Sequence, residues 1–291
     1  MSAQVDAGGA SDKMAGKLAI LCGGGQVPLK VAASAAAAGR DFVVLALRGQ
    51  TEPGIEAFPH EWLRIGEVGR LFKLLGNHDC RELVIVGHVL RPDFKTIRFD
   101  LGGMMNLPRI LAMMMGGDDH LLSSMIRFIE ERGPRIVGAH EIAPELVLGE
   151  GAGGRRKPGR QDMRDIALGR RVLAALGPFD VGQSVVVDRG WVVAVEAAEG
   201  TDAMLARCAE LRRGRVKRPS GVLVKTPKPG QELRVDMPTI GTRTVEAAAE
   251  SQLAGIAAEA GATLVADPDE MIAAADRLRL FVTGFSGQEP L

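Results

Sequence analysis

A proline-containing segment, 221–241 (GVLVKTPKPGQELRVDMPTIG), carries the densest group of residues that could act on a phosphate. A short apolar run is followed by Lys225 and Lys228, and then by Arg234 and Asp236. Fixed cations stabilise phosphoryl oxygens, and a carboxylate can hold a metal ion or a water. The segment therefore predicts a site for a phosphorylated substrate. The competing interpretation is a solvated loop with an incidental ion pair.

A second group of candidate residues is acidic. The run VVVDRGWVVAVEA predicts a β-hairpin, because Asp-Arg-Gly stands between two β-branched runs. The hairpin leads to Glu196, and Glu199, Thr201 and Asp202 follow at the start of a predicted helix over 202–212. Carboxylate oxygens are ligands for Mg²⁺ and can polarise a water. Solvated acids around a helix cap at Thr201 are the alternative.

A glycine turn follows the first predicted strand, 17–22. Its residues are Gly23, Gly24, Gly25 and Gln26, and Pro28 then suits the first turn of a helix. A strand, a glycine turn and a helix N-terminus together form a cradle for phosphate or a nucleotide. The sequence GGGQVP matches neither of the common phosphate-loop patterns, so a tight structural turn is the alternative.

Polar residues also stand at the ends of other predicted elements. His88 ends a strand over 83–89 and is followed by Arg91 and Asp93, which could contact a polar ligand, although a hydrogen-bonded structural histidine is the simpler interpretation. Two further pairs are substrate-binding candidates: Asp118 and Asp119, which open a predicted helix, and His140 and Glu141, which end a predicted strand over 135–141.

A methionine-rich stretch, 101–117, holds five of the twelve methionines. Thioether side chains fill irregular cores and also form adaptable apolar surfaces. Core packing of a helix over 107–115 is the favoured interpretation, and a groove for acyl chains is the alternative.

Composition narrows the class of protein. The 291 residues are 46% hydrophobic and 25% charged, with a formal net charge of zero, which argues against a nucleic-acid partner. The three cysteines have no metal-binding spacing, and a reducing, cytoplasmic setting is expected. No apolar run approaches the roughly 18 residues needed to span a bilayer.

Alternating apolar runs and helical patterns predict two α/β domains. The first is Rossmann-like, with a parallel sheet covered by helices on both faces, and the second is a smaller mixed α/β domain. The expected divisions are a flexible leader (1–15), an N-terminal domain (16–149), a glycine-rich basic linker (150–160) and a C-terminal domain (161–291). Near the C-terminus the pattern predicts a helix over 245–260 and a strand over 262–266.

Taken together, the motifs resemble the UDP-2,3-diacylglucosamine pyrophosphatases of the LpxI type. The matching motifs, in order, are GGGQVP, GHVLRPDF, GDDHLL, GAHE, VVVDRGWVVAVEAAEGTDAML and the segment 221–241. The resemblance implies a Mg²⁺-dependent hydrolase that converts UDP-2,3-diacylglucosamine to UMP and 2,3-diacylglucosamine 1-phosphate (lipid X) in lipid A biosynthesis. It also implies a homodimer, and the lipid substrate suggests peripheral contact with the inner membrane.

The resemblance implies that Asp236 serves both metal binding and catalysis. It also implies that Glu196 and Glu199 are further metal ligands. Contact with the pyrophosphate, or maintenance of the loop, is expected of Lys225, Lys228, Gln231 and Arg234. Two rival functions use similar residues: a non-catalytic nucleotide- or lipid-binding module, and a nucleotidyltransferase that acts on a lipid phosphate.

Overall fold

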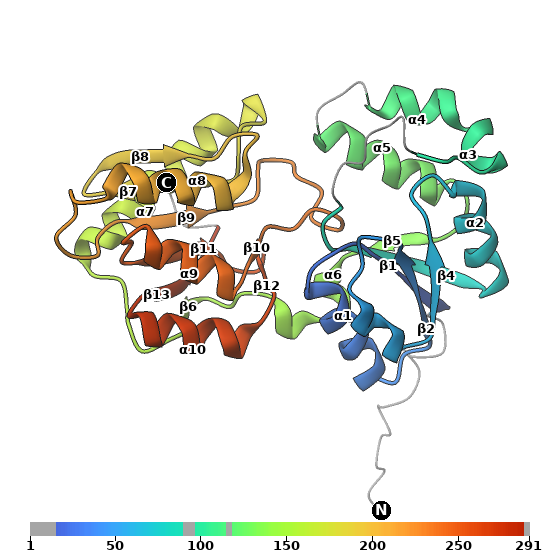
Figure 1. The fold of residues 1–291 in the computed structure, drawn as a ribbon, viewed down its shortest axis with the longest axis horizontal. Coiled ribbons are helices and arrows are strands. Elements are labelled where there is room, and N and C mark those ends of the chain that lie inside the picture. Colours follow the sequence, from blue (N-terminus) through green and yellow to red (C-terminus); the bar gives the residue numbers. More distant parts are fainter. Residues whose placement is uncertain (1–15, 90–96, 115–117, 288–291) are drawn as a thin grey trace, which may run out of the picture. The chain divides into compact units, whose positions relative to one another are not determined.

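The computed structural model describes residues 16–89, 97–114 and 118–287, and these form two compact units, Met1–Ile142 and Ala143–Leu291. Each unit is an α/β structure with its own sheet (Figure 1). Each unit is described by itself.

The first unit contains a parallel sheet of five strands in the order β3-β2-β1-β4-β5. Its strands are β1 (Lys17–Cys22), β2 (Phe42–Leu47), β3 (His60–Leu63), β4 (Cys80–Val86) and β5 (Arg135–Val137). Its helices are α1 (Val27–Ala37), η1 (Pro53–Ala57), α2 (Val68–Asn77), α3 (Leu101–Met105), α4 (Leu107–Met114), α5 (Asp118–Glu130) and α6 (Ala139–Ile142). This strand order is that of the doubly wound nucleotide-binding fold, which confirms the predicted Rossmann-like sheet.

Two groups of helices cover this sheet. Helix α1 packs with α6, whereas α2 packs with α3, and α4 with α5. Figure 1 shows α1 and α6 apart from the group α2 to α5. The chain adds β2 and β3 on one side of β1 and then β4 and β5 on the other side. Because parallel crossovers are right-handed, this reversal places the two groups of helices on opposite faces of the sheet.

The second unit contains a mixed sheet of six strands in the order β6-β13-β11-β9-β7-β8. Its strands are β6 (Gly151–Ala152), β7 (Ser184–Asp188), β8 (Trp191–Val195), β9 (Val222–Lys225), β11 (Gly255–Glu259) and β13 (Phe281–Phe285), and a separate parallel pair joins β10 (Thr239–Ile240) to β12 (Leu264–Val265). Its helices are η3 (Pro144–Leu146), α7 (Arg160–Leu176), η4 (Gly177–Phe179), α8 (Gly200–Arg212), α9 (Thr242–Glu250) and α10 (Pro268–Leu278). This sheet confirms the predicted mixed α/β second domain, although the unit, Ala143–Leu291, is not smaller than Met1–Ile142.

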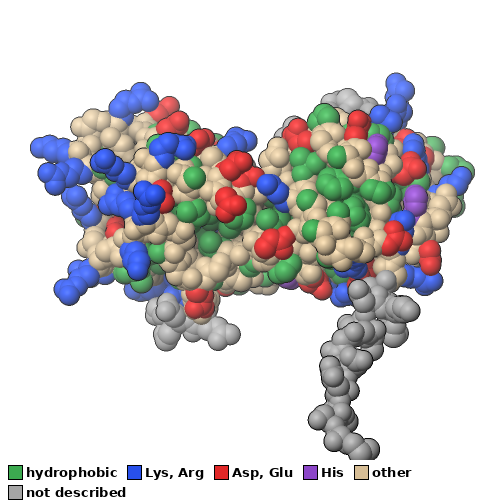
Figure 2. Space-filling view, turned by 90° about the horizontal axis from the view of Figure 1, so that it is seen from below, with side chains coloured by type: hydrophobic (Ala, Val, Ile, Leu, Met, Phe, Trp, Pro, Cys, Tyr) green, Lys and Arg blue, Asp and Glu red, His purple; other side chains and the backbone are tan. Residues whose placement is uncertain are grey.

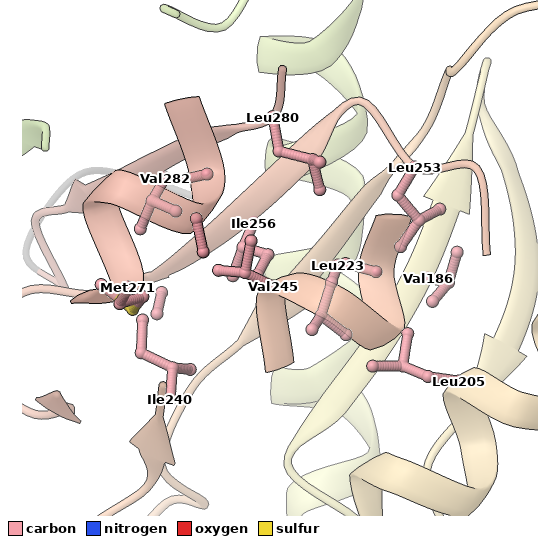
Figure 3. Packing of buried hydrophobic residues seen from close by; sticks show 14 of the residues in the cluster. Val186, Leu205, Leu223, Ile240, Val245, Leu253, Ile256, Met271, Leu280 and Val282 are labelled. Atoms are coloured by element: carbon pink, nitrogen blue, oxygen red, sulfur yellow. The ribbon is translucent and has the colours of Figure 1, made fainter. Parts of the chain in front are cut away.

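Two hydrophobic layers hold the second unit together. On one face of the sheet, Val186, Leu223 and Ile256 pack with Leu205 of α8 and Val245 of α9 (Figure 3). The other face packs against α7 through a second cluster: Ile166, Leu173, Val185, Val187, Val222, Val224, Ala254, Ala257, Phe281 and Phe285. Burial of apolar surface on both faces explains why the strands read as continuous apolar runs.

Three expectations about this unit differ from the structure. The predicted helix over 245–260 is wrong in its second half, because α9 ends at Glu250 and Gly255–Glu259 forms the buried strand β11. The segment expected to be a linker, 150–160, contains β6, which pairs in antiparallel fashion with β13. The two compact units meet at Ile142/Ala143, seven residues before the boundary expected after residue 149.

Surface charge is not spread evenly, although the net charge is zero. On the face shown in Figure 2, Lys and Arg side chains gather over the second unit, and hydrophobic side chains form a patch over the first. No helix among the described residues is long and apolar enough to cross a membrane.

Candidate functional site

Lys225 is the centre of a buried polar network in the second unit. It is the last residue of β9 and is only 4% exposed. The ammonium donates to Oγ1 of Thr201 at 2.8 Å and to Oγ of Ser184 at 3.3 Å. Ser184 begins β7 and stands directly opposite Lys225 in the antiparallel register. A buried ammonium is costly without such partners, so the network holds its position.

Glu196 extends the network to the end of β8. The Thr201 hydroxyl donates to the Glu196 carboxylate at 2.9 Å, and the Glu196 N–H donates to the Ser184 carbonyl at 2.9 Å. Gly182, at φ +52°, approaches so closely that a Cβ there would overlap the Glu196 carbonyl. Only glycine fits both the conformation and the space, which fixes where the acidic segment leaves the sheet.

Three carboxylates act on the buried ammonium. Burial lowers the pKa of Lys225, and the negative charges of Glu196, Asp202 and Asp236 work in the opposite direction. The structure therefore brings the acidic group 196–202 and the segment 221–241 within electrostatic reach of one buried lysine. This convergence occurs where β8 and β9 end, the edge at which α/β proteins bind ligands.

Gln231 shapes the loop that carries Asp236. Its side-chain amide N–H donates to the Asp236 carboxylate at 2.6 Å and to the Asp236 carbonyl at 2.7 Å. Its carbonyl oxygen accepts from the Lys228 N–H at 2.7 Å. Gln231 is buried, so these bonds close the loop 228–236 from within. Of the two roles expected for Gln231, maintenance of the loop is the one these contacts favour.

The two other predicted cations of this loop have acidic partners in the same unit. Lys228 forms an ion pair with Asp180, and Arg234 donates two hydrogen bonds to Glu232, at 2.9 and 2.7 Å. The bond from Arg234 holds the pKa of Glu232 below its usual value. These pairs set the directions of both side chains in the absence of substrate.

The predicted metal ligands do not form a group of three. Among the described residues, no cluster of three or more His, Cys, Asp or Glu side chains could hold a metal ion. Glu199 accepts from Arg207 at 2.8 Å, which lowers the Glu199 pKa, and Glu196 accepts from Thr201. Asp236 remains a suitable oxygen donor, because Mg²⁺ commonly binds one or two carboxylates together with substrate phosphates.

The glycine turn of the first unit is used mainly for structure. The N–H of Gly24 donates to the His88 carbonyl at 2.7 Å and the N–H of His88 returns a bond to Gly24 at 3.1 Å, while Gly23 donates to Val86 at 2.8 Å. Gly25 adopts φ +94°, a conformation that favours glycine. The amides of Gly23 and Gly24 are therefore committed to the neighbouring strand end rather than to a phosphate, in agreement with the alternative of a tight structural turn.

The remaining predicted residues have varied positions. Gln26 is the N-cap residue of α1, and α5 begins at Asp118 and Asp119, whose side chains lie outside the description. Arg91 and Asp93 also lie outside the described residues. The strand predicted over 135–141 is wrong in its second half, because β5 ends at Val137 and His140 and Glu141 belong to α6. Glu141 accepts from the Gly138 N–H at 2.7 Å, a bond that requires this turn.

The methionine-rich stretch exposes part of its apolar surface. Leu101, Met104 and Met105 of α3 are 75%, 61% and 76% exposed, whereas Met113 of α4 is buried. The stretch therefore supplies both a core residue and an open apolar surface on the first unit.

Sequence reasoning missed Ser184 and Asp180. Ser184 is a fully buried hydroxyl at the start of an otherwise apolar strand, and this break in the apolar pattern was the available signal. Asp180 stands at φ +56°, and nothing in the sequence near it points to Lys228, 48 residues away.

Comparison with known proteins covers nearly the whole chain. Residues 17–146 match the family model of the LpxI N-terminal domain, and residues 149–283 match that of the LpxI C-terminal domain. A curated protein of Caulobacter vibrioides (strain ATCC 19089 / CIP 103742 / CB 15), named UDP-2,3-diacylglucosamine pyrophosphatase LpxI, is 45% identical over 276 residues. That alignment covers 94% of this chain and 99% of the relative, and it confirms the resemblance that the motifs indicated.

Proposed function

This chain belongs to the LpxI family, and on that premise we propose that it hydrolyses the pyrophosphate bond of UDP-2,3-diacylglucosamine to UMP and lipid X in lipid A biosynthesis. The observation that carries the proposal is the convergence of Lys225, Glu196, Asp202 and Asp236 at one edge of the second sheet. Lys225 and Glu196 are buried charges of opposite sign at the ends of strands, an arrangement typical of a catalytic centre rather than a structural surface. A relative that is 45% identical along its whole length and is named a pyrophosphatase favours hydrolysis over the two rival functions.

In the proposed mechanism, Asp236 orients the attacking water. Lys228 and Arg234 exchange their acidic partners for oxygens of the pyrophosphate, which places positive charge where negative charge develops. Lys225 is buried and has a positioning role, because its ammonium holds Thr201 and the acids around it. Water attacks in line, and the bridging oxygen leaves with UMP if the sugar-side phosphorus is the one attacked.

Mg²⁺ is part of the proposal, with Asp236 as the ligand that this chain supplies. When bound, Mg²⁺ neutralises charge on the pyrophosphate oxygens. Removal of divalent ions with a chelator should lower turnover by roughly 100-fold or more, and added Mg²⁺ should restore it. Full activity after exhaustive chelation would exclude the metal from the mechanism. We also expect a homodimer that contacts the inner membrane peripherally from the cytoplasm.

The function is tested by phosphorus NMR of the purified protein with UDP-2,3-diacylglucosamine and Mg²⁺ in water enriched in oxygen-18. Loss of the pyrophosphate signals and appearance of UMP and lipid X would support the hydrolase. The product that carries the isotope-shifted signal identifies the phosphorus that water attacks. An intact substrate, under conditions where it binds, would instead favour the binding module, and a new nucleotide product that retains a pyrophosphate bond would favour the nucleotidyltransferase.

A further inference from the structure

A short turn after α7 lies against the loop of Lys228. At its first residue, Gly177, a Cβ would overlap the ring of Pro229, so the two backbones are in close contact. At its last residue, Asp180, the carboxylate pairs with Lys228. In the absence of substrate the turn thus contacts, at both ends, the loop that the proposed function places at the pyrophosphate, and Phe179 lies between these two contacts.

Phe179 is an exposed apolar side chain in this turn. It is 74% exposed, one of the most exposed large hydrophobic residues among those described. The N–H of Asp180 donates to the Gly177 carbonyl at 3.0 Å, and Asp180 is held at φ +56°, so the turn is locally ordered.

The chemistry of the turn indicates which half of the substrate it suits. A nucleobase is selected by hydrogen bonds to its polar edge, but Pro178 has no N–H and the N–H of Asp180 is already used within the turn. The turn therefore presents an apolar ring and little with which to select a base. An acyl chain needs only apolar contact, and covering the ring with such a chain removes both surfaces from water.

We propose that Phe179 contacts an acyl chain of the lipid substrate and helps the protein select UDP-diacylglucosamines with long acyl chains over those with short ones. The inference rests on the proposed function and assigns to this site a residue for the lipid half of the substrate. Phe179 takes no part in bond cleavage. Its effect is on binding, and it should depend on the length of the acyl chain.

The test compares Phe179→Ala, Phe179→Leu and the wild type on two UDP-diacylglucosamines, one with long and one with short acyl chains. For the long-chain substrate, Phe179→Ala should raise KM by roughly 10-fold with little change in kcat, because an apolar contact is lost. For the short-chain substrate, the change in KM should stay within about 2-fold. Phe179→Leu keeps an apolar side chain and should remain close to the wild type, whereas stacking on uracil would be lost with leucine.

Trp191→Ala is the matched control, since Trp191 is 78% exposed and begins β8, at the opposite end of the strands from Lys225. It should leave KM unchanged for both substrates. Equal effects of Phe179→Ala on long and short chains, no effect at all, or the same effect in Trp191→Ala would each overturn the inference. If the wild type hydrolyses neither substrate, the proposed function fails, and the dissociation constants of the same proteins and substrates then decide the role of Phe179 by the same chain-length criterion.

Discussion

The ammonium of Lys225 donates a 2.8 Å hydrogen bond to the hydroxyl of Thr201, and this bond joins the end of β9 to the first turn of α8. The lysine therefore does more than supply charge. It links the segment that carries Asp236 to the segment that carries Glu196, so that the two halves of the candidate site keep one geometry.

Replacement of Lys225 by methionine should lower kcat/KM by roughly 100-fold, because both the positive charge and the link to Thr201 are lost. Lys225→Arg should not restore activity, since the pocket is buried and a guanidinium has a different shape. Steady-state kinetics on correctly folded protein would measure this. Lys217→Met, at an exposed position, is the control and should have wild-type kinetics. Near-normal turnover in Lys225→Met would remove the lysine from the site.

Replacement of Asp236 by asparagine should lower kcat by on the order of 100-fold to 1000-fold. Asparagine keeps an oxygen that can accept from Gln231, so the loop should retain its shape while the negative charge is lost. Thermal unfolding should be nearly unchanged, which separates a chemical effect from a structural one. Asp269→Asn, an exposed change on α10, is the matched control. An Asp236→Asn protein with most of the wild-type kcat would show that another group activates the water.

Arg212 should be a major contributor to the stability of the second unit. Its buried guanidinium donates to the Asp188 carboxylate at 2.8 Å and to the carbonyls of Ser251 and Ser220 at 2.8 and 2.7 Å. Arg212→Met should cost about 3 to 5 kcal/mol of unfolding free energy, because it leaves a largely buried carboxylate without its cation.

Denaturant unfolding measures this cost, and two further variants make it specific. Arg213→Met changes the exposed neighbour and should stay within about 0.5 kcal/mol of the wild type. The double variant Arg212→Met/Asp188→Asn should recover part of the loss, since the unpaired charge is gone. Equal losses at positions 212 and 213 would contradict the buried ion pair as the cause.

The stability of the folded protein should depend on pH through Glu259. Burial raises the pKa of Glu259 above its usual value of 4.5, although the positive charge of Arg170 acts in the opposite direction. The folded state therefore keeps this proton to a higher pH than the unfolded chain does. The associated stability is fully present below pH 4.5 and is lost as the pH rises through the folded-state pKa.

Glu259→Gln stays neutral at every pH and isolates this effect. The variant should exceed the wild type in unfolding free energy by more near neutral pH than near about pH 4. Denaturant unfolding of both proteins at both pH values measures this difference. A constant difference between the two proteins across this range would show that Glu259 titrates normally.

Much of the fold followed from sequence patterns, and the errors have physical causes. The continuous apolar run 17–22 predicted β1 correctly, because strands buried on both faces leave such runs. Strand β11, Gly255–Glu259, was read as helix because alanine is a strong helix former. In the sheet, Gly255 makes room for its partner on the neighbouring strand β13: a Cβ on Gly255 would overlap the ring of Phe281. Packing between distant segments thus overrode local propensity.

The candidate site was predictable in part. Lys225 and Glu196 end neighbouring parts of one sheet, and a sequence can place residues at strand ends. The pairing of Lys228 with Asp180, and of Glu199 with Arg207, depends on the path of the backbone between elements, which no local pattern encodes. Two of the three expected metal ligands, Glu199 and Glu196, accept from Arg207 and from the hydroxyl of Thr201, partners that no local pattern indicates.

Because β6 pairs with β13, the sheet of the second unit is completed later in synthesis than the sheet of the first unit. The first unit has all five of its strands once residue 137 has emerged from the ribosome, and it can fold as the chain grows. In the second unit, the early strand β6 pairs with β13, and β13 lies inside the sheet between β6 and β11. That sheet cannot close until residues 281–285 are available, so the nascent second unit waits with β11 uncovered at one edge. An unpaired strand edge of this kind attracts other chains, and the interval before β13 arrives is when this protein should depend most on chaperones.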